Sequence, residues 1–200
     1  MQYDASVGSA SRGRLIFLVG PSGSGKDSLI DAARERLRAH RVEIARRVIT
    51  RSPESKGESA HGVSQEHFDE LRSSGAFALD WQANGLCYGI PAGIEDWLAQ
   101  GRSVLVNGSR GYLAQARARY PDLLAVGLVV DQQALRHRLL ARGRESQDEI
   151  EQRLARNGRL QVYDGSVRVL DNSGALTDAV EAFLALLDKE DVIDLSVEKI

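Results

Sequence analysis

The sequence predicts an α/β fold in which a parallel β-sheet carries helices on both faces. Two observations lead to this expectation. Short apolar runs typical of buried strands alternate along the chain with stretches in which apolar residues recur at helical spacing. The first apolar run, at residues 15–19, precedes a glycine-rich loop and a helical pattern, the order of a strand–loop–helix phosphate cradle. No internal repeat is found, so residues 14–190 are expected to form one domain.

The elements of the first third follow from local pattern. After the strand at 15–19, helical spacing of apolar residues predicts a helix over 27–40. The apolar run at 42–50 predicts a second strand. A polar loop over 51–63 then leads into a helix over 64–73.

The next segment interrupts the strand–helix alternation. Asn84-Gly85 is a turn dipeptide, so residues 76–89 are expected to form short strands around it. Pro91 suits the first turn of a helix, which predicts a helix from Pro91 to Gln100 that Gly101 ends. In a small phosphotransferase an acceptor-binding lobe would be inserted here, over about 51–100.

Regular alternation then resumes. A buried strand over 103–106 ends at Asn107 and is followed by a helix over 109–120. The apolar run at 123–130 predicts the next strand, and Asp131 is expected to cap a helix through Ala141.

The last third begins with an arginine-rich turn that contains a glycine. A helix over about 147–163, a strand over 167–170 and an amphipathic helix over 176–187 are expected after it. The Ser/Gly-rich residues 1–13 are expected to be a disordered lead, and residues 191–200 are treated as a tail.

The composition argues against nucleic acid and membrane partners and favours one cellular compartment. The formal charge of −2 argues against a protein that coats nucleic acid. No apolar run approaches the ~20 residues that span a bilayer, so no membrane partner is expected. The single cysteine, Cys87, cannot form an internal disulfide, which favours a cytoplasmic location. The sequence does not predict the oligomeric state.

The glycine-rich loop is the strongest functional signal. Glycines let successive backbone N–H groups turn toward one anion, while Lys26 adds a point charge and the following helix adds its partial positive charge. This chemistry predicts binding of a nucleoside triphosphate with magnesium. The residues expected to hold it are Gly20, Pro21, Ser22, Gly23, Ser24, Gly25, Lys26, Asp27 and Ser28.

Asp27 stands where such loops usually carry Ser or Thr. A carboxylate can hold magnesium directly or through water, because that ion prefers oxygen ligands. An acid in the first turn can instead cap the helix. The sequence leaves both roles of Asp27 open.

Arginines are the candidates for the transfer step, which needs charge neutralisation more than a covalent group. Arg138, Arg142 and Arg144 fall on or beside a segment, about 142–147, that can close as a lid. Arg153 lies on the next helix and can point back. The alternative is a solvated basic face.

A second set of polar residues is expected to bind the acceptor. Arg46, Arg47 and Arg51 lie at the end of the second expected strand, where Arg47 and Arg51 would share one face. Converging arginines suit a phosphorylated acceptor. Residues after the strand at 103–106 should face the same crevice as the phosphate loop, namely Asn107, Ser109 and Arg110.

Together these residues resemble the guanylate kinase-like group of P-loop kinases over nearly the whole chain. Thr50-Arg51, Gly57-Glu58, Asn84-Gly85, Tyr88-Gly89 and Arg142-Gly143-Arg144 occur in that group's order. The resemblance implies a P-loop kinase fold, with Arg51 and Tyr88 holding the acceptor's phosphate. Leu79, however, stands where guanylate kinases place a glutamate that reads guanine, and Ser109 where they place a second acid.

A closer resemblance is to the ribose 1,5-bisphosphate phosphokinase family. It is carried by Gly25-Lys26-Asp27-Ser28 and by the segments 45–51, 81–85, 104–110, 115–120 and 142–145. It implies transfer of the ATP γ-phosphoryl group to the 1-phosphate of ribose 1,5-bisphosphate, in phosphonate breakdown. Asn84, Asn107 and Ser109 would then bind ribose hydroxyls.

Two alternatives are considered. One is a guanylate kinase that converts GMP to GDP, against which Leu79 and Ser109 argue. The other is a non-catalytic guanylate kinase-like interaction module. Such modules typically lose the phosphate-loop lysine, whereas Lys26 is present here.

Overall fold

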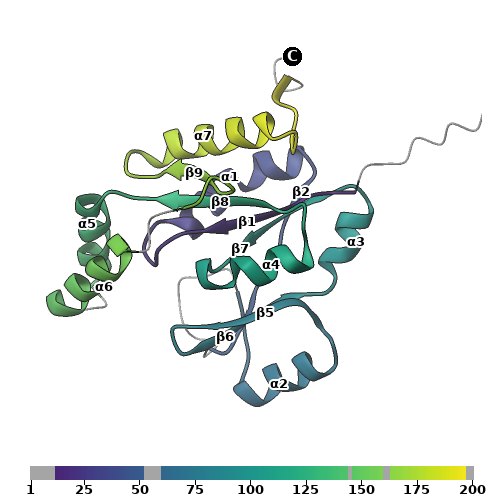
Figure 1. The fold of residues 1–200 in the computed structure, drawn as a ribbon, viewed down its shortest axis with the longest axis horizontal. Helices are drawn as coiled ribbons and strands as arrows, with labels where there is room; N and C mark the ends of the chain where they lie inside the picture. Colours follow the sequence, from purple (N-terminus) through teal and green to yellow (C-terminus); the bar gives the residue numbers. More distant parts are fainter. Residues whose placement is uncertain (1–11, 52–59, 144–145, 160–162, 197–200) are drawn as a thin grey trace, which may run out of the picture.

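The computed structural model describes residues 12–51, 60–143, 146–159 and 163–196. Among these residues, five strands form a parallel sheet in the order β2-β7-β1-β8-β9 (Figure 1). The predicted α/β fold with a parallel sheet is confirmed. The strands are β1 (Leu15–Val19), β2 (Val42–Ile44), β7 (Ser103–Asn107), β8 (Leu124–Val129) and β9 (Arg168–Asp171).

The central strand β1 is buried on both faces because helices cover the sheet on each side. Ile16 and Leu18 pack in one apolar cluster with α1 (Lys26–Ala39) and α7 (Leu176–Lys189). Phe17 points the other way and packs with α3 (Ile94–Ala99) and α4 (Leu113–Arg119). This alternation follows from the two-residue period of a strand. A short 3₁₀ helix, η1 (Arg110–Tyr112), joins β7 to α4.

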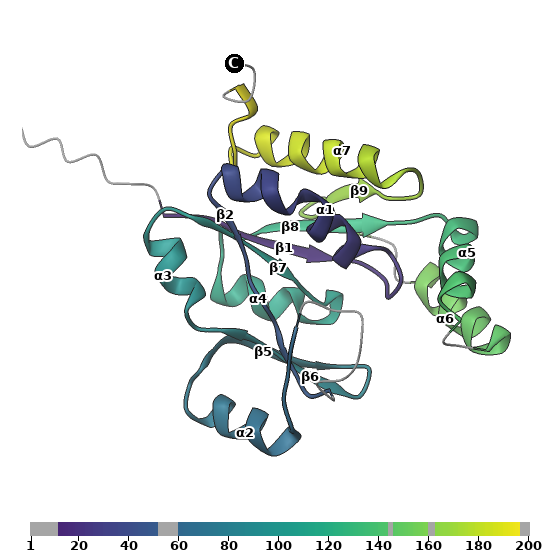
Figure 2. The ribbon, with the colours of Figure 1, turned by 180° about the vertical axis from the view of Figure 1, so that it is seen from behind.

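A smaller sheet lies on the α4 side of the main sheet, and Figure 2 shows it from behind. Its strand order in the described chain is β4-β3-β6-β5. Asn84 and Gly85 have φ of 51° and 75° and form the tight turn between β5 and β6, as the sequence predicts. The elements are β3 (Val48–Ile49), β4 (His61–Gly62), α2 (Gln65–Ser73), β5 (Phe77–Ala83) and β6 (Leu86–Pro91).

The expected strand over 42–50 is wrong, because it is two strands in different sheets. The amide of Ala45 still donates to the carbonyl of Leu105 in the main sheet, at 2.9 Å. Two residues later the carbonyl of Arg47 accepts from the amide of His61 in the smaller sheet, at 2.7 Å. Residues 45–47 therefore cross between the sheets, and Arg47 and Arg51 lie on opposite ends of β3 rather than on one face of a longer strand.

Two other boundaries differ from the sequence expectation. Pro91 does not begin a helix, because it completes β6 opposite Phe77, and α3 begins at Ile94. The expected loop over 51–63 contains β4, which pairs in parallel with the two-residue strand β3.

Two helices extend beyond the end of β8. These are α5 (Gln132–Arg142) and α6 (Gln147–Arg159), which pack on each other through a small apolar cluster that includes Leu139 and Leu154. The predicted cap is confirmed, since the carboxylate of Asp131 accepts from the amide of Ala134 at 2.9 Å. Arg144 of the expected lid lies outside the described residues.

The two ends of the described chain are attached to the core. Residues 12 and 13 of the expected lead contact α3, since Arg12 pairs with Glu95 at 2.6 Å and the amide of Gly13 donates to the carbonyl of Leu98 at 2.8 Å. Residues 1–11 lie outside the described residues. Beyond α7, Ile193 is buried, so part of the expected tail contributes to the core. A search of the described helices finds none with the length and apolar character to cross a membrane.

Phe68 holds α2 on the smaller sheet, and its truncation tests that packing. Its side chain is fully buried, with its ring centroid 4.8 Å from that of Phe77. Phe68→Ala is expected to lower the free energy of unfolding by about 3–5 kcal/mol, because a cavity remains. Urea denaturation followed by circular dichroism measures the change. Glu70→Ala, on the exposed side of α2, should cost less than about 0.5 kcal/mol, and an equal loss in both variants would contradict the packing role of Phe68.

Candidate active site

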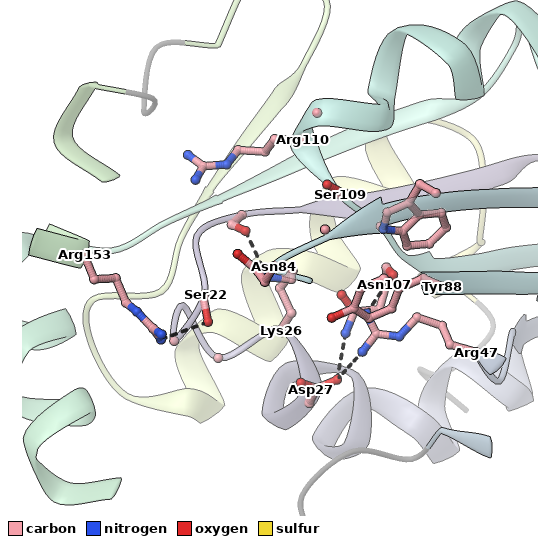
Figure 3. A pocket seen from close by; sticks show the side chains of 17 residues that line it. Ser22, Lys26, Asp27, Arg47, Asn84, Tyr88, Asn107, Ser109, Arg110 and Arg153 are labelled. Atoms are coloured by element: carbon pink, nitrogen blue, oxygen red, sulfur yellow. Dashed lines mark hydrogen bonds and ion pairs between the residues drawn. The ribbon is translucent and has the colours of Figure 1, made fainter. Parts of the chain in front are cut away.

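A cavity of about 520 Å³ lies beyond the carboxyl ends of β1 and β7, between the main sheet and the smaller sheet (Figure 3). Parallel sheets collect ligands at this edge, because the loops after neighbouring strands meet there. Thirteen of the residues expected from the sequence line it, namely Gly20, Ser22, Gly23, Gly25, Lys26, Asp27, Arg47, Asn84, Tyr88, Asn107, Ser109, Arg110 and Arg153.

The loop between β1 and α1 forms the floor of the cavity. Gly25 adopts φ of 88°, and a Cβ there would lie 2.6 Å from Nδ2 of Asn172, so only glycine fits without strain. That same Nδ2 donates to the carbonyl of Ser24 at 2.7 Å and fixes the loop from behind. The amino group of Lys26 donates to the carbonyls of Gly20 and Pro21, at 3.0 and 3.2 Å, and so lies over the loop.

Three expected loop residues do not line the cavity. Ser24 is fully buried beneath the loop and Ser28 is exposed on α1. Pro21 faces the site through its backbone carbonyl, which holds Lys26.

Asp27 connects the loop to the opposite wall. Its Oδ1 accepts from Nδ2 of Asn107 at 2.7 Å and lies 3.5 Å from a guanidinium nitrogen of Arg47. Asn107 is buried, and its Oδ1 has no hydrogen-bond partner within the described chain. A carboxylate beside an amide oxygen that still needs a partner is a donor set that fits a magnesium ion.

The arginines expected to act in transfer are not all brought together. Arg153 of α6 reaches the loop, since its Nη1 donates to Oγ of Ser22 at 3.2 Å. Arg138 of α5 lies behind the loop, where Nη2 donates to the carbonyl of Gly174 at 3.5 Å and Nη1 is buried. Arg142 is the last residue of α5, and its side chain lies outside the described part of the chain, as does Arg144.

The wall opposite the loop is aromatic, and the sequence analysis missed its central residue. Trp81 lines the cavity, and its ring stacks on Tyr88 with centroids 5.5 Å apart and an interplanar angle of 7°. Tyr112 stacks on Trp81 at 5.4 Å, and burial raises the pKa of its hydroxyl. The signal that marks Trp81 is its place on β5, two residues from Leu79 and Ala83 on the same inward face.

Of the three arginines expected to bind the acceptor from this segment, only Arg47 lines the cavity. The guanidinium of Arg47 lies 5.5 Å from the centroid of the Tyr88 ring and donates to the carbonyl of Asn107 at 3.2 Å. Arg46 points away and donates to the carbonyl of Ala60 at 3.4 Å. Arg51 lies past the end of β3 and is not among the lining residues.

Comparison with known proteins gives close relatives over most of the chain. The chain is 63% identical over 176 residues to the ribose 1,5-bisphosphate phosphokinase PhnN of Pseudomonas paraeruginosa, covering 88% of this chain and 95% of the relative. The chain belongs to the ribose 1,5-bisphosphate phosphokinase family. Further members are those of Azotobacter vinelandii, 60% identical over 88% of this chain and 97% of the relative, and of Thiobacillus denitrificans, 44% identical over 90% and 96%.

Solved structures confirm the fold of this family member. The guanylate kinase of Anaplasma phagocytophilum matches it with a TM-score of 0.67 at 19% identity, over 92% of this chain and 89% of that one. At this identity the likeness shows the P-loop kinase fold alone. No family model matches the chain.

Gly25→Ala tests the loop geometry. The substitution introduces both an unfavourable positive φ and a contact with Asn172, so nucleotide affinity is expected to fall by about tenfold or more. Calorimetric titration with ATP measures it. Gly111→Ala is the matched control, because Gly111 lines the same cavity and a Cβ there would meet only Oγ of Ser109, at 3.9 Å. Equal affinity losses in the two variants would argue against the cradle.

Proposed function

We propose that this protein transfers the γ-phosphoryl group of ATP to the 1-phosphate of ribose 1,5-bisphosphate and forms 5-phosphoribosyl 1-diphosphate. The observation that carries the proposal is one cavity that joins a phosphate loop to a cationic and aromatic wall. Among the described residues that line this cavity, Asp27 is the one acidic side chain. Such a site suits an acceptor that presents phosphates rather than a base to be read. The names of the relatives support the same substrate.

The reaction needs little from the protein beyond position and charge. An oxygen of the acceptor's 1-phosphate is already ionised at neutral pH, so no strong general base is required. That oxygen forms a bond to the γ-phosphorus as the bond from this phosphorus to the departing ADP oxygen breaks. Lys26 and the lid arginines Arg142 and Arg144, with Arg138 and Arg153, are proposed to neutralise the charge of the transferring group.

Magnesium is proposed to bind beside the loop. Asp27, with Asn107 next to it, would hold the ion, which supplies positive charge to the phosphates of ATP when bound. The protein itself holds Oδ1 of Asp27 2.7 Å from Nδ2 of Asn107, at the carboxyl edge of the sheet.

The acceptor is proposed to lie against the opposite wall. Arg47 and Arg110 are suited to its phosphates, and Tyr88 closes the wall beside Arg47. Ribose hydroxyls would be bound by Asn84, Asn107 and Ser109, which present amide and hydroxyl groups to the cavity. Arg46 and Arg51 do not line the cavity, and we propose that they contribute to acceptor binding from outside it.

The geometry disfavours the guanylate kinase alternative. Leu79 is buried in the apolar core, and the neighbouring Asp80 is bound at 2.8 Å by Nε of Arg72, so neither residue lines the cavity. Among the described residues of this wall, a purine would therefore find no carboxylate. The non-catalytic alternative is disfavoured because Lys26 is present and lies over the loop.

The metabolic role and the cellular location of the protein are also part of the proposal. We infer a role in phosphonate breakdown from the resemblance, and a cytoplasmic location because the only cysteine, Cys87, is buried and free.

Phosphorus NMR tests the reaction directly. Purified protein with Mg-ATP is offered ribose 1,5-bisphosphate in one tube and GMP in another. We expect ADP and a diphosphate on the anomeric carbon of the sugar, with GMP unchanged. Lys26→Ala should slow the reaction by about 100-fold or more, because one donor to the transferring phosphate is lost. Formation of GDP with an untouched sugar would refute the proposal.

Tryptophan emission tests where the acceptor binds. The chain has two tryptophans, of which Trp81 lines the cavity and Trp97 lies on α3, partly buried against the core. In Trp97→Phe the remaining emission should change when ribose 1,5-bisphosphate is added with Mg-ADP. In Trp81→Phe it should stay constant, and a change seen only in that variant would place the acceptor elsewhere.

A further inference from the structure

The aromatic side chains of the acceptor wall form one set of stacked groups. Trp81 of β5 and Tyr88 of β6 are directly opposite each other in the antiparallel pair, so both side chains leave the smaller sheet on the same face. The Trp81 ring is nearly parallel to that of Tyr88 and lies within 28° of that of Tyr112. The guanidinium of Arg47 lies over the Tyr88 ring (Figure 3). Side chains from distant parts of the sequence are thus stacked beside the cavity.

The stacked rings meet the cavity through their edges. Trp81 and Tyr88 are the two aromatic residues among those described as lining it. Trp81 is only 6% exposed and Tyr88 only 9%. A ring with one open face would expose far more of its surface than this. The ring faces are therefore covered by the neighbouring side chains, and the cavity is left with the rims.

The edge and the face of an aromatic ring bind different partners. The face carries negative partial charge and the edge carries positive partial charge. A nucleobase gains affinity from an aromatic side chain by stacking on its face. An edge instead suits oxygen atoms with negative charge, such as those of a phosphorylated sugar. This wall therefore favours such a sugar over a nucleotide, although it is aromatic.

Tyr112 belongs to the stack without being among the residues described as lining the cavity. Its amide donates to the carbonyl of Ser109 at 3.1 Å, which ties the ring to the loop after β7. Tyr112 is half-buried, and its neighbours Arg110 and Gly111 do line the cavity. Removal of the Tyr112 ring would therefore uncover part of the Trp81 indole beside the cavity.

We propose that Tyr112 is a positioning residue that sets acceptor specificity: by covering Trp81 it leaves only the indole edge to the acceptor, and so excludes acceptors that carry a nucleobase. The inference rests on the proposed function and deepens it, because it names what selects a sugar bisphosphate over a nucleoside monophosphate. Leu79 offers a base no hydrogen bond, and the closed stack offers it no aromatic face.

The test compares two ligands that share a ribose 5-phosphate. Ribose 1,5-bisphosphate carries a phosphate on the anomeric carbon, where GMP carries a base. Each is titrated calorimetrically into wild-type protein and Tyr112→Ala, with Mg-ADP present to occupy the phosphate loop. Tyr112→Ala should bind GMP about tenfold more tightly than wild type, because the base can stack on the uncovered indole. The preference for the sugar should fall by at least the same factor.

Two further variants separate stacking from a general loss of structure. Tyr112→Phe keeps the ring and should retain the wild-type preference for the sugar. Leu113→Ala truncates the adjacent side chain, which packs against the same apolar cluster but has no ring to stack, so the preference should again be retained. An equal change in Leu113→Ala, or a lost preference in Tyr112→Phe, would overturn the role of the ring. Thermal melts check that each variant is folded. If Tyr112→Ala does not fold, Tyr112→Val takes its place, because it also removes the ring.

Tryptophan emission locates the base. In the Trp97→Phe background Trp81 is the remaining tryptophan. GMP should quench its emission when Tyr112→Ala is also present and should leave it unchanged otherwise. Tighter GMP binding without quenching, or an unchanged preference in Tyr112→Ala, would overturn this inference and leave the proposed function standing. A wild-type protein that binds GMP but not the sugar would overturn both.

Discussion

The parallel pairing of β1 with β7 on one side and β8 on the other brings the chemistry of this protein to one place. Leu18 is paired with Asn107, so the residue after β1 that begins the phosphate loop lies next to the end of β7. The pairing is held by apolar side chains on both faces of β1, all of them buried. Because the strands run in the same direction, their polar termini meet at one edge, and Asp27 can reach an amide that lies 80 positions away in the sequence.

Cations around the cavity are positioned largely by backbone carbonyls. Lys26 is bound by the carbonyls of Gly20 and Pro21, Arg47 by that of Asn107, and Arg138 by that of Gly174. A neutral acceptor fixes the direction of a cation without bringing a charge of its own. The carboxylate of Asp27 differs, because it brings a negative charge within 3.5 Å of the Arg47 guanidinium.

Features set by local chemistry could be predicted from the sequence, whereas long-range contacts could not. The phosphate loop, the Asp131 cap and the Asn84-Gly85 turn each depend on a few adjacent residues. No glycine or proline marks the crossing at 45–47, so the run from 42 to 50 reads as one strand although partners in two sheets divide it. The bridge between Asp27 and Asn107 and the stacking of Trp81 depend on tertiary packing, which periodicity alone does not describe.

The smaller sheet shares an apolar cluster with the main one, since Leu79, Trp81 and Ile90 pack with Phe17 and Val106. This has a consequence for how the acceptor side can change. The smaller sheet cannot be exchanged as a unit for that of a relative, because its inner face packs directly against Phe17 of β1. A new acceptor specificity is therefore expected to arise through substitutions at the cavity surface, for example at Ser109, which lines the cavity and lies outside the shared cluster.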